Sequence, residues 1–330
     1  MLKPITIGTV ELSVPVFLAP MSGVSDPPFR KLARRLGAPV TVSEMIASRE
    51  ALRETRGSMK RMLFDASESP RIVQIAGHDP AIMAEAARFV VDQGAQIIDI
   101  NFGCPARKVT EKFCGSALMR EEGLAGRIMQ AVAAAVSVPV TIKMRLGWDQ
   151  DSLNAPVFAR MAEGAGIQAM TVHGRTRMQL YSGQADWRAV AEVKAATRLP
   201  LIVNGDIDGQ QSMADALAQS GADGVMIGRA SYGRPWIVGQ LAALAQGLAM
   251  PGEPPQGEKL ALILEHYEDV LIHHGRERGV LAARKHLAWY IREEPGAPAL
   301  REKIMHLTDA ADVRRALCDF FAPHPDRMVA

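Results

Sequence analysis

The stretch GAQIIDINFGCP, residues 94–105, carries the pattern from which the fold can be predicted. Its centre, Ile97–Asn101, is a short and mostly apolar run, which is typical of a parallel strand buried on both faces. A helical pattern precedes this run at Pro80–Gln93, and another follows it at Gly123–Val136. The stretch is therefore predicted to be one strand in a series of βα units.

The same alternation repeats about eight times and stops near residue 245. Helical stretches such as Leu153–Ala165 separate the apolar runs. Eight βα units in about 240 residues predict an α/β fold of the (β/α)8 TIM-barrel type. The strand candidates are Pro15–Ala19, Val40–Glu44, Ile72–Ile75, Ile97–Asn101, Val138–Met144, Ala169–His173, Leu201–Asn204 and Gly224–Gly228.

A Gly- and Pro-rich segment, GLAMPGEPPQG, marks a domain boundary at residues 247–257, because these residues favour an extended linker. Beyond it, Glu258–His274 and Gly279–Glu293 carry apolar residues at helical spacing, and no strand pattern appears up to Phe321. We expect a catalytic barrel domain at 1–246, a linker at 247–257 and a small all-α domain at 258–330.

The composition is that of an ordinary globular protein, with 48% hydrophobic and 22% charged residues in a chain of 330. Apolar stretches such as Met129–Ile142 are interrupted before the roughly 20 residues that a membrane span needs. The start, Met1–Gly8, lacks the pattern of a signal peptide, so we expect a cytoplasmic protein.

Cysteine content and charge limit the classes of site. The cysteines Cys104, Cys114 and Cys318 are too few and too scattered for a disulfide framework, and no CxxC pair indicates a zinc site, so no metal is expected. The formal net charge of +2 does not by itself indicate a nucleic-acid binder. Any contact with RNA must come from local patches.

Polar residues follow nearly every predicted strand. In a TIM barrel these positions form the rim at the carboxyl ends of the strands, where active sites lie. One such residue is more often a satisfied polar group at a strand end, but a full set in chain order indicates an active site. The set is Pro20, Met21, Ser22, Glu44, Gln74, Asn101, Cys104, Lys143, Arg145, His173, Asn204, Gly205, Asp206, Gly228 and Arg229.

Two features of this set indicate an anionic ligand. Lys143 lies inside the apolar run VTIKM, where an ammonium is costly to bury unless it faces an anionic or electron-rich partner; a structural ion pair is the alternative. The last two strands end in IVNGD and MIGR, with glycine where a backbone comes close to a ligand. Phosphate sites recur in these loops of TIM barrels, so Gly228 and Arg229, before a short helix from Pro235, predict a phosphorylated cofactor.

Cys104 directly follows the fourth strand and precedes a charged loop, Ala106–Gly115, of the kind that forms mobile lids. A thiol on this rim can act as a general acid, and a small packing residue is the alternative. Cys114 lies later in the same loop, where packing is the favoured interpretation.

These motifs together resemble the tRNA-dihydrouridine synthases, most closely their bacterial B-type branch. The resemblance covers nearly the whole chain, and Cys114 departs from it, because a small residue without a thiol is expected there. It is carried by APMSGVSDPPFR, VSEM, VQIAGHDP, IIDINFGCPARKV, VTIKMRLGW, TVHGRTR, VNGDI, MIGRASYGRPW and ARKHLAWYIRE.

The resemblance implies an FMN enzyme that uses NADPH to reduce the C5–C6 double bond of a uridine in the tRNA D-loop. Cys104 would be the catalytic acid that protonates C5 after hydride reaches C6. The residues that would hold FMN are Pro20, Met21, Ser22, Gln74, Lys143, His173, Asn204, Gly205, Asp206, Gly228 and Arg229.

The helical domain of this family binds tRNA, yet here residues 258–330 hold 11 Lys and Arg against 12 Asp and Glu, a net charge of −1. RNA affinity must therefore come from patches. The candidates for these patches are Arg284, Lys285 and His286 in the helical domain, and Arg107, Lys108, Arg175 and Arg177 around the rim. Asn101 and Arg145 at the strand ends are further candidates for contact with the RNA substrate.

Two alternatives remain open at this point. A small-molecule flavin reductase of the dihydroorotate or dihydropyrimidine type would share the barrel, but it would not need the appended helical domain. A non-catalytic RNA-binding protein on a barrel scaffold would not need Cys104 and Lys143 at the rim.

Overall fold

The structure is a computed structural model that describes residues 1–322, and the chain divides into two compact units. The first comprises Met1–Ala230 and Trp236–Met250, and the second comprises Ser231–Pro235 and the chain from Pro251 onward. The division after Met250 falls inside the expected linker, whereas Ser231–Pro235, which the sequence assigns to the barrel, groups with the second unit. The end of the expected helical domain, residues 323–330, lies outside the described residues.

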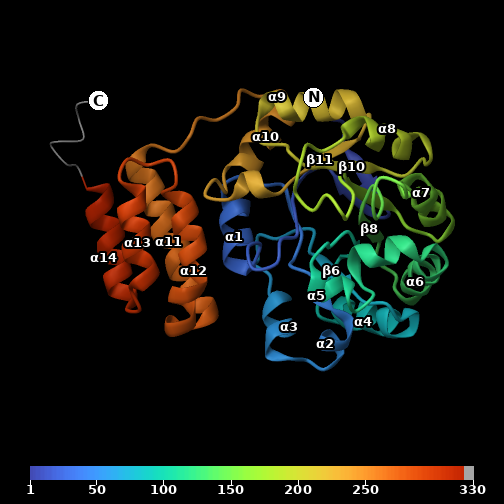
Figure 1. The fold of residues 1–330 in the computed structure, drawn as a ribbon, viewed down its shortest axis with the longest axis horizontal. Helices are drawn as coiled ribbons and strands as arrows, with labels where there is room; N and C mark the ends of the chain where they lie inside the picture. The colour runs from blue at the N-terminus through green and yellow to red at the C-terminus, as the bar shows by residue number, and fades with distance from the viewer. Residues whose placement is uncertain (323–330) are drawn as a thin grey trace. The chain divides into compact units, whose positions relative to one another are not determined.

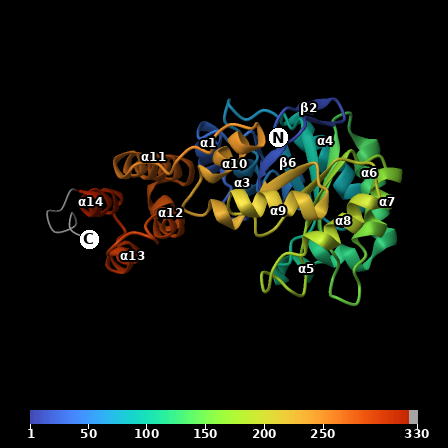
Figure 2. The same cartoon turned by 90° about the horizontal axis from the view of Figure 1, so that it is seen from above.

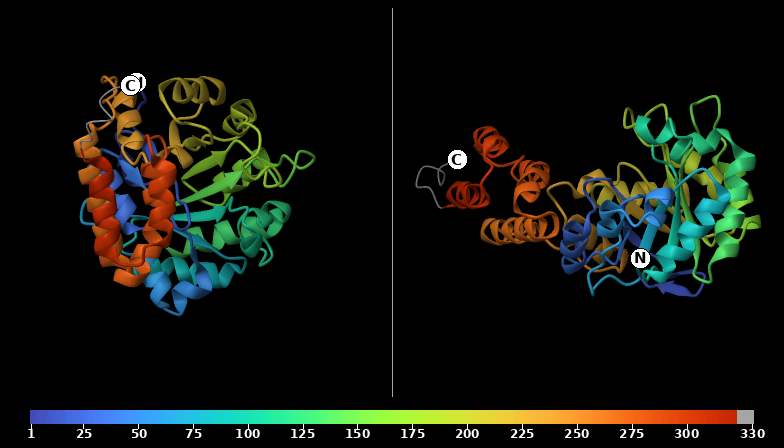
Figure 3. Two further views of the ribbon diagram at one scale, coloured as in Figure 1. Left: turned by 60° about the vertical axis from the view of Figure 1, so that its left-hand side comes forward. Right: turned by 90° about the horizontal axis from the view of Figure 1, so that it is seen from below.

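The first unit is a parallel sheet that curls into a barrel with helices outside it (Figures 1 and 3). A parallel bridge between Val42 and Ile72 joins the two ends of the sheet, so β4 and β5 together fill one strand position and the ring closes. The predicted TIM barrel is confirmed. In spatial order the strands are β4 (Val40–Thr41), β3 (Val16–Leu18), β11 (Gly224–Ile227), β10 (Leu201–Asn204), β9 (Ala169–His173), β8 (Val140–Arg145), β7 (Ile97–Phe102), β6 (Ile72–Ala76) and β5 (Ile46–Ala47).

The helices lie outside the sheet (Figure 2), and some of them begin at capping residues that the sequence supplies. Asp79 caps α4 by accepting from the N–H groups of Ala81 and Ile82, and Asp26 caps α1 through Phe29. The helices are α1 (Pro27–Arg35), α2 (Ser48–Leu52), α3 (Arg56–Arg61), α4 (Pro80–Asp92), α5 (Arg107–Thr110), α6 (Glu122–Ala135), α7 (Ala155–Gly164), α8 (Trp187–Ala195), α9 (Gln210–Ser220) and α10 (Ile237–Ala245), with 3-10 turns η1 (Gly115–Arg120) and η2 (Arg229–Ser231).

Strand ends differ from the predicted ones where the backbone cannot continue the ladder. The first and fifth predicted strands start after Pro15 and Pro139, because proline has no N–H to donate. The predicted strand Val40–Glu44 is interrupted, because the hydroxyl of Ser43 accepts from the backbone N–H of Gln74 in place of a ladder carbonyl.

A short antiparallel hairpin, β1 (Ile5–Ile7) with β2 (Val10–Leu12), covers one end of the barrel. Its Ile7 and Leu12 pack in a buried cluster with residues from the starts of the strands, such as Ile72 and Ile97. The amino-terminal end of the barrel is therefore plugged by apolar side chains, and the carboxyl end is left for a site.

The second unit consists of helices α11 (Gln256–His274), α12 (Arg276–Tyr290), α13 (Ala297–His306) and α14 (Ala310–Phe321). Its core includes Ile263, Tyr267, Leu287 and Leu317, all nearly inaccessible to solvent. Tyr232 from the segment Ser231–Pro235 stacks on Trp289 of α12, with ring centroids 4.1 Å apart. Across residues 1–322, no helix has the length and apolar character that crossing a membrane requires.

Candidate active site

Polar side chains from consecutive strands lie side by side at the carboxyl end of the barrel. The parallel register pairs Asn101 with Lys143, Arg145 with His173, and His173 with Asn204. Neighbouring strands thus bring together residues that are 28 or more positions apart in the chain. Those of the predicted rim residues that lie on β7, β8, β9 and β10 form one continuous arc.

Lys143 is the cation at the centre of this arc. Its Nζ donates to Oδ1 of Asn204 at 3.0 Å across the barrel mouth. Burial and the nearby Arg145 lower the pKa of Lys143 to about 8, while Asp99 and Cys104 oppose this shift. The ammonium is therefore mostly protonated at neutral pH, and it is poorly solvated, which favours contact with an anionic or electron-rich ligand.

His173 is neutral in this environment. Burial, together with the positive charges of Lys143, Arg145, Arg175 and Arg229, holds its pKa well below the ordinary value of 6.5. A neutral imidazole can donate from one ring nitrogen and accept at the other. Gly205 packs closely against the imidazole of His173, because a Cβ at this position would lie 2.8 Å from the ring carbon Cδ2. The absence of a side chain at Gly205 therefore allows the backbone to pack against His173.

Asp206 joins two arginines at the next strand end. It lies at a positive φ of 55° and accepts from Arg175 at 2.5 and 3.0 Å and from Arg229 at 3.0 Å. Arg175 also donates to the carbonyls of Ser182 and Gly183. Arg175 is 1% exposed, so the expectation that it belongs to an exposed RNA-binding patch is wrong. Its guanidinium positions the loop after β9.

Arg145 has a similar role. It donates to the carbonyls of Gly103, Thr176 and Leu180, and it is 2% exposed. These partners hold the guanidinium of Arg145 inside the rim, and its contact with the substrate stays a prediction. Its charge still contributes to the positive potential at the barrel mouth, as the lowered pKa of His173 shows.

Cys104 is half-buried at the end of β7, and its backbone is held at two points. Its N–H donates to Oδ1 of Asn101 at 2.8 Å, and its carbonyl accepts from the N–H and the hydroxyl of Ser116. Asn101 in turn donates from Nδ2 to Oε1 of Gln74 at 2.7 Å. Gln74 and Asn101 are therefore committed to each other inside the barrel mouth, and the thiol lies in a defined loop.

The turn after β3, the first strand of the barrel, contributes to the same rim. The hydroxyl of Ser25 accepts from the N–H of Met21, and Ser22 is exposed. A Cβ added to Gly228 would approach only Met21 and Ala19, at 3.8 and 3.9 Å, which are ordinary contacts. The position of Gly228 therefore lies beside Met21 and Ala19 without a close clash.

The loop that follows Cys104 carries exposed charge. Arg107 pairs with Glu111 at 2.6 Å on the short helix α5, and Lys108 is exposed beside it. Cys114 lies 3.6 Å from Nδ1 of His78, and burial raises the pKa of its thiol. Among residues 1–322, no group of three His, Cys, Asp or Glu side chains is arranged to hold a metal ion.

Comparison with known proteins identifies the family. Residues 17–322 match the model of the dihydrouridine synthases. The chain belongs to the dihydrouridine synthase family. It is therefore an enzyme, and in TIM-barrel enzymes active sites lie at the carboxyl ends of the strands, where the polar arc is found.

Relatives of this dihydrouridine synthase match it over nearly its whole length. A probable tRNA-dihydrouridine synthase of Rhodobacter capsulatus is 49% identical, with 93% of this chain and 94% of the relative covered. The tRNA-dihydrouridine synthase B of Pseudomonas aeruginosa is 46% identical, with 96% of each covered, and that of Xanthomonas axonopodis is 48% identical, with 96% and 95% covered. The resemblance to the B-type branch is confirmed.

Solved structures of similar fold are more distant. Histamine dehydrogenase from Rhizobium sp. 4-9 is 13% identical with a TM-score of 0.56, covering 81% of this chain and 50% of that chain. Morphinone reductase is also 13% identical, with a TM-score of 0.53, covering 76% of this chain and 91% of that chain. These likenesses support the barrel fold of the dihydrouridine synthase.

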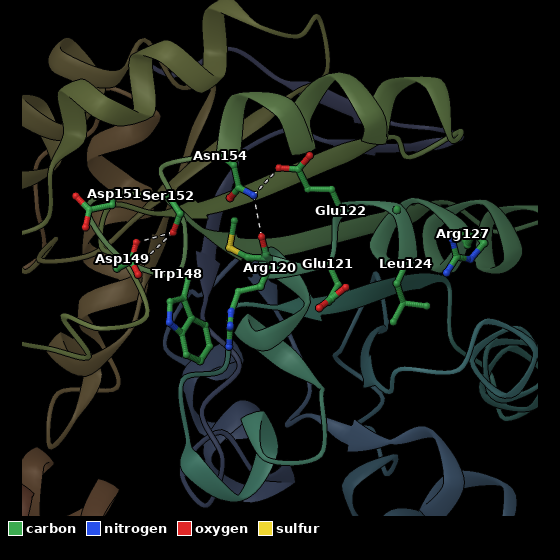
Figure 4. Close-up of a pocket in the computed structure, with 12 residues that line it drawn as sticks. Arg120, Glu121, Glu122, Leu124, Arg127, Trp148, Asp149, Asp151, Ser152 and Asn154 are labelled. Carbon is green, nitrogen blue, oxygen red and sulfur yellow. Dashed lines mark hydrogen bonds between the residues drawn. The ribbon is translucent and has the colours of Figure 1, made fainter.

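A pocket of about 820 Å³ lies beside the rim of the synthase, between the start of α6 and the loop after β8 (Figure 4). Trp148 lies at its edge, and Figure 4 shows the Arg120 guanidinium beside the indole ring. Arg120 and Arg177 lie 5.0 and 4.7 Å from the Trp148 ring centroid. Of the predicted RNA contacts, Arg177 thus belongs to a cation and aromatic cluster on the rim.

The predicted RNA contacts in the second unit differ from one another. His286 is 2% exposed and packs against the rings of His266 and Trp289, so it belongs to the helical core and its expected place in a surface patch is wrong. Arg284 is half-buried and donates to the carbonyl of Leu307. Lys285 is half-buried on the same helix.

Sequence reasoning missed three residues at the barrel mouth of the synthase. Asp99 lies inside the strand IIDIN, and its acidic side chain in an apolar run is the signal that could have found it. Tyr181 is exposed, and the Cζ atom of Arg229 lies over its ring, 4.8 Å from the centroid of the Tyr181 ring. Trp148 and Tyr181 are aromatic residues in rim loops, where flat side chains suit contact with bases.

The lowered pKa of His173 predicts a specific acid sensitivity. Below pH 6.5, the ordinary pKa of histidine, His173 is protonated in the unfolded chain but stays neutral in the folded protein. The free energy of unfolding therefore falls as the pH drops. Replacing His173→Gln should therefore remove part of the loss of stability that the parent shows between about pH 7.5 and about pH 5.5. Urea unfolding at the two pH values measures this difference. The exposed His78→Gln variant is the control, and an equal acid loss in His173→Gln and the parent would contradict the assignment.

Proposed function

We propose that this enzyme reduces the C5–C6 double bond of a uridine in the D-loop of tRNA to 5,6-dihydrouridine, with FMN as its flavin and NADPH as the electron donor. The observation that carries the proposal is the placement of Cys104, held by Asn101 at the edge of a barrel mouth that contains Lys143 and neutral His173. The tRNA named in its relatives supports the substrate. A cytoplasmic location follows from that substrate.

The charge balance of the barrel mouth fits a phosphorylated flavin. Lys143, Arg145, Arg175 and Arg229 all act on His173, and Asp206 is the carboxylate bonded to two of these cations. An anion at the mouth would relieve this excess of positive charge. Gly228 beside Arg229 suits a phosphate, since a backbone without a side chain permits close approach.

In the proposed complex, Gly228 and Arg229 hold the phosphate, while Lys143 and His173 contact the ring system from the barrel interior. Pro20, Met21, Ser22 and Gln74 border the same space from β3 and β6. Asn204 orients the ammonium of Lys143 through its Oδ1. Asp206 and Gly205 act indirectly, because their contacts position Arg229 and His173. When bound, reduced FMN supplies the hydride that adds to C6 of uracil.

The residues of the chain then complete the reaction. Hydride addition to C6 leaves negative charge on C5 and O4 of the base, and the Cys104 thiol donates its proton to C5. Lys143 lies beside Asn101, the residue that holds the backbone of Cys104, so its positive charge is near the place where the proton is given up. The base must leave its stack to reach this depth, which a structured tRNA loop permits.

The RNA would be held by residues around the rim and on the helical unit. Arg177 with Trp148, and Arg107 with Lys108 on the loop after Cys104, lie on the barrel unit. Arg284 and Lys285 lie on α12 of the second unit. A net charge of −1 over residues 258–330 means that the placement of cations, and not their total, must provide the affinity.

The decisive experiment is nucleoside mass spectrometry of unmodified tRNA incubated with the protein, FMN and NADPH. We expect a gain of two mass units on one uridine of the D-loop. Cys104→Ala should keep bound flavin and its reduction by NADPH, but dihydrouridine formation should fall by about 100-fold or more, since a positioned acid contributes that much. The matched control is Cys318→Ala, another half-buried cysteine, which lies on α14.

Each other outcome selects a different function. Wild-type turnover in Cys104→Ala would remove this thiol from the chemistry. Reduction of free pyrimidines without any product on tRNA would favour the small-molecule reductase, and tRNA binding without flavin would favour a non-catalytic RNA-binding protein.

Lys143→Met tests the cation at the barrel mouth. Loss of a charge-assisted contact should weaken FMN binding about tenfold. Flavin fluorescence titration of the flavin-free protein measures the change without any need for turnover. Lys194→Met is the matched control, because Lys194 pairs with Asp223 at the opposite end of the strands. Equal FMN affinity in Lys143→Met and the parent would refute this role.

Arg177→Ala tests the cation and aromatic cluster on the rim. If Arg177 contacts a phosphate, its loss should weaken tRNA binding severalfold and reduce the dependence of log K on log salt by about 1. Filter binding at several salt concentrations gives both values. Arg198→Ala is the control, since Arg198 is exposed just before β10 at the amino end of the barrel. An unchanged salt slope in Arg177→Ala would place the RNA elsewhere.

A further inference from the structure

Asp99 is a carboxylate inside the barrel whose role the proposed reaction leaves open. It lies in β7 and is 5% exposed. Residues two apart in a strand point to the same face, so Asp99 and Asn101 both point into the barrel, while Ile98 and Ile100 point toward the outer helices. A buried carboxylate costs free energy unless hydrogen bonds and nearby charge compensate it.

Both oxygens of Asp99 have partners on the two neighbouring strands. Oδ1 accepts from the hydroxyl of Thr141 on β8 at 2.7 Å, and Oδ2 accepts from Nε2 of Gln74 on β6 at 2.7 Å. The strand register places Gln74 and Thr141 directly beside Asp99. Burial raises the pKa of Asp99, and the two hydrogen bonds and the charge of Lys143 oppose that shift.

The hydrogen bond from Gln74 to Asp99 gives direction to a chain of amides. Because Gln74 turns its NH2 group toward Oδ2 of Asp99, its Oε1 is left to accept from Nδ2 of Asn101. Asn101 must therefore turn its own Oδ1 outward, where it accepts from the N–H groups of Gly103 and Cys104 at 3.1 and 2.8 Å. The orientation of each amide follows from that of the one before it.

We propose that Asp99 is a positioning residue for Cys104, acting through Gln74 and Asn101. The inference rests on the proposed function in that Cys104 is the proton donor to the base. Without the carboxylate, both amides can reverse, and a reversed Asn101 would present an NH2 group to the N–H of Cys104. Two donors repel each other, so the loop after β7 would lose the hydrogen bond that holds the thiol at the barrel mouth.

The test compares variants that keep the branching of the side chain but differ in hydrogen bonding. Asp99→Leu removes both acceptors. Asp99→Asn keeps an acceptor for Gln74 and can donate to Thr141, so it should preserve the direction of the amides. Thr141→Val removes one donor to Asp99, and Thr171→Val is its matched control, a buried threonine on β9 that is not part of the chain.

The first measurement is the rate at which iodoacetamide alkylates Cys104 in the purified full-length protein, followed by peptide mass spectrometry with Cys318 as the internal reference. Release of the loop in Asp99→Leu should raise the Cys104 rate about fivefold or more, as expected for loss of a buried hydrogen bond. Asp99→Asn and Thr171→Val should stay within about twofold of the parent, and Thr141→Val should fall between.

The second measurement is dihydrouridine formation at saturating tRNA. We expect kcat to fall by about 100-fold in Asp99→Leu, as misplacement of a reacting group can cause, with KM for tRNA nearly unchanged and recovery in Asp99→Asn. Equal alkylation and equal kcat in folded Asp99→Leu would overturn the proposal. If Asp99→Leu does not fold, equal behaviour of Thr141→Val and Thr171→Val overturns it instead.

Failure of the proposed function would be recognised separately. In that case the parent itself forms no dihydrouridine, while the alkylation rates still decide whether Asp99 controls the position of Cys104.

Discussion

The parallel bridge between Val42 and Ile72 turns an open sheet into a ring, and the active site depends on this closure. In an open parallel sheet the carboxyl ends of the outer strands would lie far apart. Closure brings the turn after β3, with Met21, into the same ring as Gly228 after β11 and Gln74 on β6. The apolar hairpin at the opposite end leaves this ring as the accessible mouth.

Concentration of positive charge is the second consequence of closure. Four cations act on one imidazole, and the pKa values of His173 and Lys143 are both lowered as a result of burial and of these charges. Such an arrangement is unfavourable for the isolated protein, which is why it indicates a ligand. Hydrogen bonds to Asp206 hold Arg175 and Arg229 in place, so the charges are present before any ligand arrives. Preorganised charge of this kind is a common basis of binding and catalysis.

Much of the fold could be predicted, because each strand is an apolar run bounded by turn residues and each such run is followed by a helical pattern. The predicted strand boundaries are wrong where a particular residue prevents the backbone from pairing. Pro15 and Pro139 delay two strands, and Ser43 interrupts another by bonding to the backbone of Gln74. The roles of Arg145, Arg175 and His286 could not be predicted. A cation beside a strand end looks the same in the sequence whether its partners are RNA phosphates or the carbonyls of a distant loop.

The sequence by itself determined the barrel, the helical unit and the identity of the residues at the rim, since local periodicity and strand order are enough to place a residue at the carboxyl end of a parallel strand. Only the tertiary structure decided which rim residues face a ligand and which hold others in position. Arg175 meets an aspartate 31 residues away, and the chain from Asp99 to Cys104 passes through Gln74 on another strand. Hydrogen bonds between strands depend on register and side-chain direction, which a single sequence does not specify.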